Sequence, residues 1–111
     1  MHHTLEQEIN QLHAEFCAGL ADPKRLLILY TLSEGPRNVT DLSASLGLSQ
    51  PAASRHLKVL RDRGMVTATR VGAAVEYRLA DQRLIQALDI LRAAMRDHMS
   101  RRAELIGAIE E

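Results

Sequence analysis

Two short helix patterns separated by one glycine occupy residues 38–63, and this arrangement limits the folds that the chain can adopt. Asn38 is placed to cap a helix over "VTDLSASL". Ser49 is placed to cap a second helix, which has Pro51 in its first turn, where a missing N–H costs nothing. Between the two helices, Gly47 can take the positive φ that reverses the chain. Two short helices joined by a turn that contains glycine predict a helix-turn-helix.

The second of these helices has one apolar face and one polar face. Small and aliphatic residues recur at helical spacing at Ala53, Leu57 and Leu60, so we expect them to face the core. The residues left on the outer face are Gln50, Ser54, Arg55, Lys58 and Arg61. Alanines beside them keep this face lean, and bulky residues there would hold a partner away from the helix backbone.

A β-hairpin is predicted directly after this helix, which we expect to end at Gly64. The segment "MVTATRVGAAVEYRL" alternates apolar and polar residues on both sides of the turn "VGAA", as a hairpin over residues 65–79 does. A helix-turn-helix followed by a hairpin is a winged helix-turn-helix, in which the hairpin is the wing. We therefore expect a mainly α fold with a small β-hairpin, in a single domain that spans residues 1–111.

Further helices are predicted on both sides of this unit. Over residues 4–20, apolar residues recur every three or four positions and predict an amphipathic helix. Asp22 and Pro23 mark the start of a second helix, "RLLILYTL", whose apolar run predicts thorough burial. The final helix is predicted over residues 81–106. Its apolar stripe consists of Leu84, Leu88, Leu91, Met95 and Met99.

The composition agrees with one compact domain that has an aliphatic core. The chain has 111 residues, 46% of them hydrophobic, which is close to the commonest domain size. Its aromatic residues are Phe16, Tyr30 and Tyr77, too few for an aromatic cage or for a platform that stacks single-stranded bases. The one cysteine, Cys17, cannot form an internal disulfide, and no run is apolar enough for a signal peptide or a membrane span. We expect a cytoplasmic protein with no membrane partner.

Charge is unevenly distributed, although Lys plus Arg and Asp plus Glu balance at 14 each. Residues 1–22 hold four acidic residues and no Lys or Arg, whereas residues 51–78 hold six Lys or Arg against two acidic residues. The basic segment contains the polar helix and the hairpin. A positive surface on a lean helix next to a wing predicts binding to double-stranded DNA.

The side chains of the basic segment divide by what they can reach on DNA. Those in the first turns of the second helix can hydrogen-bond to base edges in the major groove. We assign this role to Gln50, Ser54 and Arg55. Cations further along are better placed for phosphates, and we assign those contacts to Lys58, Arg61 and Arg63. Arg70, near the hairpin tip, is predicted to reach the DNA backbone or an adjacent minor groove.

Three segments closely resemble the ArsR/SmtB family of bacterial winged-helix repressors: "LADPKRLLILYTL", "VTDLSASLGLSQPAASRHLKVLRDRGMV" and "EYRL". The resemblance extends over nearly the whole chain. It implies a homodimer joined through the first and last helices, a palindromic operator, and release of DNA when an effector binds. The predicted helices over 4–20 and 81–106 support the dimer independently, because a single copy would leave their apolar stripes partly exposed.

The metal-binding positions of this family are largely missing from the chain. Metal-sensing relatives often carry a Cys-x-Cys pair at the start of the third helix, where this chain has "VTDL". Others use carboxylate and histidine ligands on the final helix. The matching positions hold Asp81, Arg83, Ala94 and Asp97, so two ligands are lost and Arg83 would repel a cation. Redox-sensing relatives use a pair of cysteines, which the single Cys17 cannot supply.

Two other sets of residues are candidate metal ligands. The terminal amine, the next two backbone amides and the His3 ring resemble the amino-terminal motif that binds Cu(II) or Ni(II), unless this terminus is tag-derived or has no such role. His13 and Cys17 lie four residues apart on one helix face, and His98 could join them in the dimer to hold Zn(II), Ni(II) or cobalt. The alternative is a thiol buried at the dimer interface beside an exposed histidine. We expect His56 to hydrogen-bond within the DNA-binding unit instead.

Other functions stay open at this point. DNA binding without a metal, regulated by an organic ligand or by an effector-sensing partner protein, is equally compatible with the sequence. A winged helix that binds another protein is a further alternative, although such a protein has no need of a basic recognition face. We expect no enzyme, because no phosphate loop, paired carboxylates or orienting third group accompanies His13 and Cys17.

Overall fold

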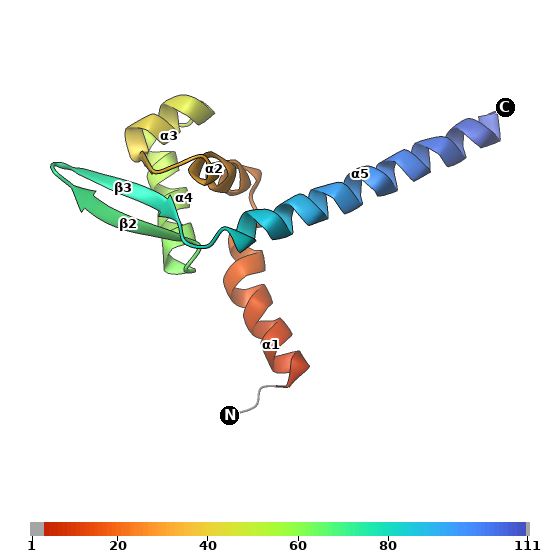
Figure 1. Cartoon of the computed structure of the whole chain (residues 1–111), viewed down its shortest axis with the longest axis horizontal. Helices are drawn as coiled ribbons and strands as arrows, with labels where there is room; N and C mark the ends of the chain where they lie inside the picture. Colours follow the sequence, from red (N-terminus) through yellow and green to blue (C-terminus); the bar gives the residue numbers. More distant parts are fainter. Residues whose placement is uncertain (1–3, 111) are drawn as a thin grey trace. The chain divides into compact units, whose positions relative to one another are not determined.

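The computed structural model describes residues 4–110, and their side chains as far as residue 108. In chain order (Figure 1) the elements are α1 (Leu5–Leu12), the π-helical turn η1 (His13–Cys17), α2 (Pro23–Ser33), β1 (Arg37–Asn38), α3 (Val39–Leu46), α4 (Gln50–Asp62), β2 (Val66–Val71), β3 (Ala74–Leu79) and α5 (Arg83–Glu110). They fall into two units, residues 1–81 and residues 82–111, and the second contains α5 alone.

The helix-turn-helix lies where the sequence predicts it and is set by local hydrogen bonds. Asn38 Oδ1 accepts from the Asp41 amide at 2.8 Å at the start of α3. Ser49 Oγ accepts from the Ala52 amide at 3.2 Å at the start of α4. Between them Gly47 has a φ of 64°, a left-handed conformation that glycine adopts without steric cost. These caps and this turn fix where α3 ends and where α4 begins.

The core of the first unit is aliphatic and is built by α2, α3, α4 and the start of β2. Its large, fully buried side chains are Ile28, Leu29, Leu42, Leu57, Leu60, Met65 and Val66. Ala53 is buried as well, so α4 packs through the predicted apolar face. The prediction that the second helix is thoroughly buried is wrong for Leu27, which is 47% exposed. A nearly uniform apolar run gives no periodic signal of which side faces solvent.

The predicted hairpin is part of a three-stranded antiparallel sheet in the order β1-β3-β2. β2 and β3 pair along their whole length. The additional strand β1 pairs only with Glu76 and Tyr77 of β3. The sequence analysis does not predict β1, because two residues are too few to show the alternation of a strand. The outer part of the hairpin, beyond β1, is a two-stranded ribbon (Figure 1).

The N-terminal helix predicted over residues 4–20 contains an interruption. Thr4 and Gln7 form a capping box that starts α1. The α-helical pattern then changes at His13 to the π-helical turn η1, and it returns at Ala18. Such a turn inserts one extra residue into a helix. No side chain of α1 is buried, and the exposed apolar residues are Leu5, Ile9 and Leu12.

The second unit is α5, a helix of 28 residues. It begins two residues after the start of the predicted range of 81–106 and ends four residues beyond it. Large apolar side chains are exposed along its length at Ile90, Leu91, Met95, Met99, Leu105 and Ile106. Within residues 4–110, no helix has both the length and the apolar character needed to cross a membrane.

Candidate nucleic-acid interface

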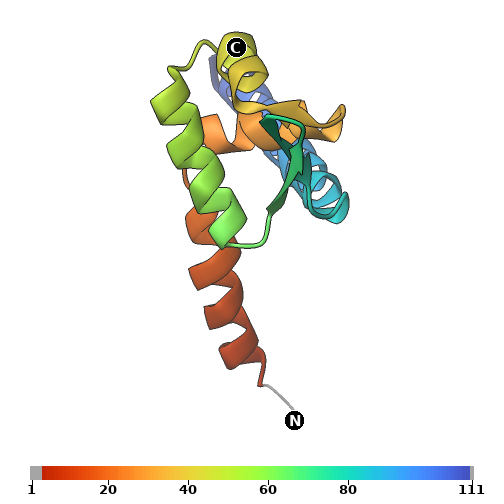
Figure 2. The same cartoon turned by 90° about the vertical axis from the view of Figure 1, so that its left-hand side faces the viewer.

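The polar side chains of α4 form one continuous exposed face, which we call the α4 outer face. It consists of Gln50, Ser54, Arg55, Lys58 and Arg61, all exposed as the helical periodicity predicts. On the other side of the helix Ala53, Leu57 and Leu60 are fully buried. Because this packing fixes the rotation of α4, the folded domain always presents the same face. Figure 2 shows α4 in green, with the hairpin beside it.

The α4 outer face carries three cations and lies next to one paired carboxylate. The side chains of Arg55 and Arg61 make no hydrogen bond or ion pair with any of residues 4–110. Lys58 Nζ donates to Asp62 Oδ2 at 2.9 Å in an exposed pair one helical turn apart. This hydrogen bond, with the charges of Lys58, Arg61 and Arg63, holds the pKa of Asp62 below its ordinary value of 3.8. The net charge of this face is therefore positive.

A side-chain hydrogen bond links the first turn of α4 to α3. Gln50 Nε2 donates to Thr40 Oγ1 at 3.3 Å, which holds the amide near the start of both helices. Beside it, a groove of about 380 Å³ lies between α3, α4 and the hairpin, and its lining includes Thr40, Ser54 and Tyr77. The sequence analysis does not select Thr40. Its place in the first turn of α3 is a signal that could have done so, because helix N-termini often contact phosphate.

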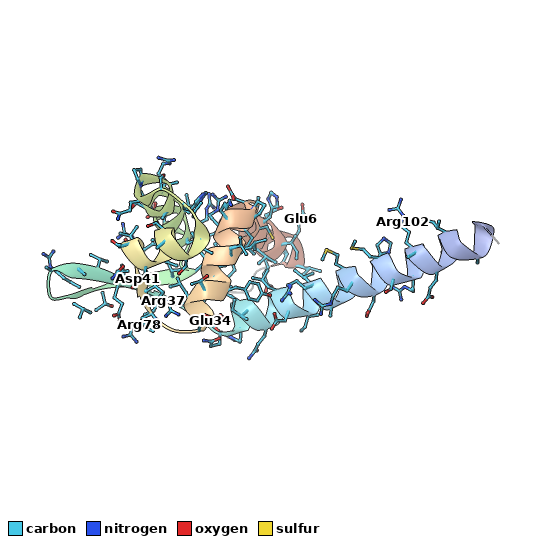
Figure 3. The ribbon with its side chains drawn as sticks, turned by 90° about the horizontal axis from the view of Figure 1, so that it is seen from above. Glu6, Glu34, Arg37, Asp41, Arg78 and Arg102 are labelled. Atoms are coloured by element: carbon cyan, nitrogen blue, oxygen red, sulfur yellow. The ribbon has the colours of Figure 1, made fainter. Side chains whose placement is uncertain are left out.

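The wing adds Arg70 to this surface. Alternate residues of a strand point to opposite faces, so Arg70 shares the face of Val66, which is buried against the helices. Arg70 itself is exposed, nearer the hairpin tip. Arg78 lies on the opposite face, where its Nη2 pairs with Glu76 Oε1 at 2.9 Å. Arg37, which pairs with Tyr77, belongs to the other face of the sheet; Figure 3 labels both arginines.

Arg63 does not belong to the α4 outer face. It follows the last residue of α4, is half-buried, and donates through Nη1 to the carbonyls of Ala14 and Glu15, the latter at 3.3 Å. Its guanidinium is therefore directed toward η1, and a contact with phosphate would require it to leave these carbonyls. The sequence gives no signal of this contact, because the residues that it joins lie 49 positions apart.

Comparisons with known proteins agree with this geometry. A family model described as "Bacterial regulatory protein, arsR family" matches residues 22–68. The crystal structure of Rv0081 from Mycobacterium tuberculosis is 35% identical, with a TM-score of 0.77, over 86% of this chain and 96% of that chain. The chain belongs to the ArsR family.

Relatives of this ArsR-family chain include a transcriptional regulator and a DNA-binding domain. The HTH-type transcriptional regulator NmtR of Mycobacterium tuberculosis is 46% identical over 71 residues, which are 64% of this chain and 59% of NmtR. The chain spans about three fifths of the length of the curated relatives that it matches. A homodimeric winged helix-turn-helix DNA-binding domain from Mycobacterium bovis is 26% identical, with a TM-score of 0.75, over 91% of this chain and 95% of that domain.

The candidate metal ligands of this ArsR-family chain come from three separate segments. His13 and Cys17 are both exposed in η1. Among the residues that the structure describes, no three His, Cys, Asp or Glu side chains come together as a metal site. His3 lies outside the described residues, and His98 belongs to the separate unit α5.

Proposed function

We propose that this chain is a sequence-specific, double-stranded-DNA-binding transcriptional repressor that acts as a homodimer on a palindromic operator. The observation that carries the proposal is the α4 outer face, whose five polar side chains are exposed on a helix locked into the core from its other side. Arg70 extends the positive surface onto the wing. A helix of this kind fits the major groove while a neighbouring hairpin contacts the flanking backbone.

Position along α4 divides the roles of its side chains. The first turns of a recognition helix contact base edges. In α4 these turns carry Gln50, Ser54 and Arg55. Gln can bond to adenine and Arg to guanine through two hydrogen bonds each. Lys58 and Arg61 lie in later turns and contact phosphates, which position the protein without reading sequence.

A homodimer covers the apolar surface that one copy leaves exposed. Leu5, Ile9 and Leu12 are exposed on α1, and six large apolar side chains are exposed on α5. Exposed apolar surface on this scale is typical of protein–protein contacts. Two-fold symmetry would place the two α4 helices about 34 Å apart, one turn of DNA, and would match a palindromic site.

Fluorescence anisotropy with tag-free protein tests the proposal. The probe is a labelled duplex of the protein's own upstream DNA, at fixed salt and with chelator, and an unrelated duplex gives the non-specific affinity. We expect the upstream duplex to bind at least about 10³-fold more tightly than the unrelated one. Arg55→Ala should reduce this ratio. The matched control is Arg102→Ala on α5, an exposed arginine outside the α4 outer face, which should bind as the parent does.

Two results would contradict the proposal. Equal affinity for both duplexes would refute sequence-specific recognition. Absence of binding to any duplex would favour the alternative winged helix that binds another protein. Light scattering of the same sample reports the oligomeric state, and a monomer at the concentrations used for binding would refute the homodimer.

The same assay tests regulation by a metal ion. Ni(II), Zn(II) or Cu(II) added in place of the chelator should lower the affinity for the upstream duplex if the amino-terminal motif with His3, or the set of His13, Cys17 and His98 in the dimer, binds the ion. Cys17→Ser should then remove the response to Zn(II). An affinity for the upstream duplex that none of the three ions changes would support regulation by an organic ligand or by a partner protein that senses the effector.

A further inference from the structure

The π-helical turn η1 has one more carbonyl than it has main-chain amides to bond to. The Ala18 amide donates to the His13 carbonyl, the first carbonyl of η1, five residues back. Further along, the Leu20 amide donates to the Phe16 carbonyl, four residues back as in an α-helix. Two carbonyls therefore lie between these bonds but only one amide does, as expected for one residue inserted into an α-helix. The extra carbonyl is open to a donor from elsewhere, either a side chain or water.

Arg63 supplies that donor from the end of α4. The two carbonyls in question are those of Ala14 and Glu15, and Arg63 Nη1 donates to both. A charged guanidinium makes stronger hydrogen bonds than a neutral donor. The contact joins the N-terminal helix to the helix that carries the proposed DNA contacts. Figure 2 shows the end of α4 beside the N-terminal helix.

Arg25 of α2 forms a second link between the same two segments. Its Nε donates to the Gly19 carbonyl at 2.5 Å, and its Nη1 lies 3.4 Å from Nδ1 of His56 in α4. His56 thus hydrogen-bonds within the first unit, as the sequence predicts. The Arg25 side chain is only 16% exposed and also lies 3.9 Å from Asp22. A change at the end of η1 therefore reaches α4 through two arginines.

Close packing at Gly19 strengthens this connection. A Cβ at Gly19 would lie 2.3 Å from Met65 Cε and 2.8 Å from Arg63 Cδ. Met65 follows α4 and is fully buried. The end of the N-terminal helix therefore packs directly against Arg63 and Met65, which follow α4. Because protein interiors are close-packed, this segment cannot move toward α4 without displacing Arg63 or Met65.

We propose that Arg25 and Arg63 are positioning residues that couple the conformation of η1 to the position of α4 on DNA. The proposal rests on the proposed function as a DNA-binding protein. When DNA fixes α4, the two guanidinium groups are held against the N-terminal helix and stabilise the π-helical turn. Conversely, a change in η1 withdraws the carbonyls that Arg63 and Arg25 bind and lowers the affinity for DNA. The two effects are equal in size by thermodynamic linkage.

Hydrogen exchange of the full chain, measured by mass spectrometry with and without saturating upstream duplex, tests the first effect. We expect the peptide that covers η1 to exchange at least about fivefold more slowly with DNA bound, the lower end of typical coupling factors. In the double variant Arg25→Gln/Arg63→Gln, exchange of η1 should no longer depend on DNA. The matched control is Lys24→Gln, which removes an exposed cation of α2 next to Arg25 that belongs neither to the α4 outer face nor to the contacts with η1, and it should keep the dependence.

The single cysteine allows the reciprocal measurement without any substitution. Cys17 lies in η1 and is exposed. Its thiolate attacks an aromatic disulfide reagent, which forms a mixed disulfide and releases an aromatic thiolate. The blocked protein should bind the upstream duplex at least about fivefold more weakly than the free protein. If η1 served stability alone, blocking Cys17 in a protein that remains folded would not lower the affinity for the duplex.

The outcomes separate this coupling from the proposed function, because anisotropy reports DNA binding in the same samples. Equal exchange of η1 with and without bound DNA, together with equal affinity of blocked and free protein, would refute the coupling and leave DNA binding intact. Protection of η1 that persists in the double variant would mean that DNA or a second copy covers η1 directly. A double variant that does not fold leaves the two measurements on the parent to decide. A parent that binds no duplex would overturn both proposals.

Discussion

Replacing Lys58 with alanine removes one cation per chain from the middle of the α4 outer face, and the salt dependence of DNA binding measures the loss. Each chain has three cations on the α4 outer face, Arg55, Lys58 and Arg61, and a fourth on the wing, Arg70, so a homodimer presents eight exposed cations. If each contacts one phosphate, the slope of log K against log salt is about −7, because one contact contributes about −0.9. Lys58→Ala removes two contacts from the dimer and should make the slope shallower by about 2.

This change in slope has a direct consequence for affinity. The loss caused by Lys58→Ala should be roughly tenfold larger at about 50 mM salt than at about 200 mM salt. It should also be similar for the upstream and the unrelated duplex, because phosphate contacts carry no sequence information. Anisotropy titrations at several salt concentrations give both quantities. An unchanged slope would refute the phosphate contact of Lys58 and with it the proposed docking of α4.

Asp62 provides the matched control for this experiment. In Lys58→Ala its carboxylate loses a donor at 2.9 Å, stays ionised near neutral pH, and repels the DNA backbone. Part of the loss therefore comes from an unmasked negative charge. The double variant Lys58→Ala/Asp62→Asn removes that charge as well, so it should recover part of the affinity and still lack the contacts of Lys58.

Three further predictions concern stability. Leu57→Ala should lower the free energy of unfolding by about 2–5 kcal/mol, because the side chain is fully buried; urea denaturation at matched protein concentration measures this, and a loss below about 0.5 kcal/mol would contradict the close packing. Gly47→Ala should lower the free energy of unfolding by about 1–2 kcal/mol because of the φ of 64° alone, since a Cβ there meets no atom within 4 Å. Gly47→Asn should lower it less, because asparagine tolerates this φ better than alanine. Equal losses in the two variants would refute this cause. The pKa of Asp62 is lowered in the folded state, so its pair with Lys58 should stabilise the fold above pH 3.8 and lose this effect as the pH falls below that value. The difference in Tm between the parent and Asp62→Asn should therefore shrink on acidification. A difference in Tm that stays constant would count against the pair.

The helix-turn-helix could be predicted from the sequence because its signals are local. Asn38 and Ser49 each bond to an amide three residues ahead, and Gly47 reverses the chain by its own φ. The two caps and the glycine turn do not depend on the rest of the fold. The spacing of apolar residues in α4 then decides which side is buried, and exposure of the α4 outer face follows from it.

The features that the sequence does not predict depend on residues distant in the chain. β1 exists because two residues pair with β3 and not because of their own pattern. The turn η1 is completed by Arg63, and five residues of helix carry no periodicity that separates a π-helical turn from an α-helix. The same contact turns the Arg63 side chain toward η1. From the sequence, its position just after α4 predicted an exposed cation, because nothing local signals the distant carbonyls.

The outer part of the wing has a further consequence. Val66 is the last buried residue of the hairpin, and from the pair of Thr67 with Arg78 out to the tip at Gly72 no residue is buried. A side chain at Gly72 would meet open space. Length is therefore adjustable at this tip, because residue pairs added there would lengthen the ribbon while the core and α4 stay unchanged. Within this fold, the span of DNA that one copy covers can be altered at the wing alone.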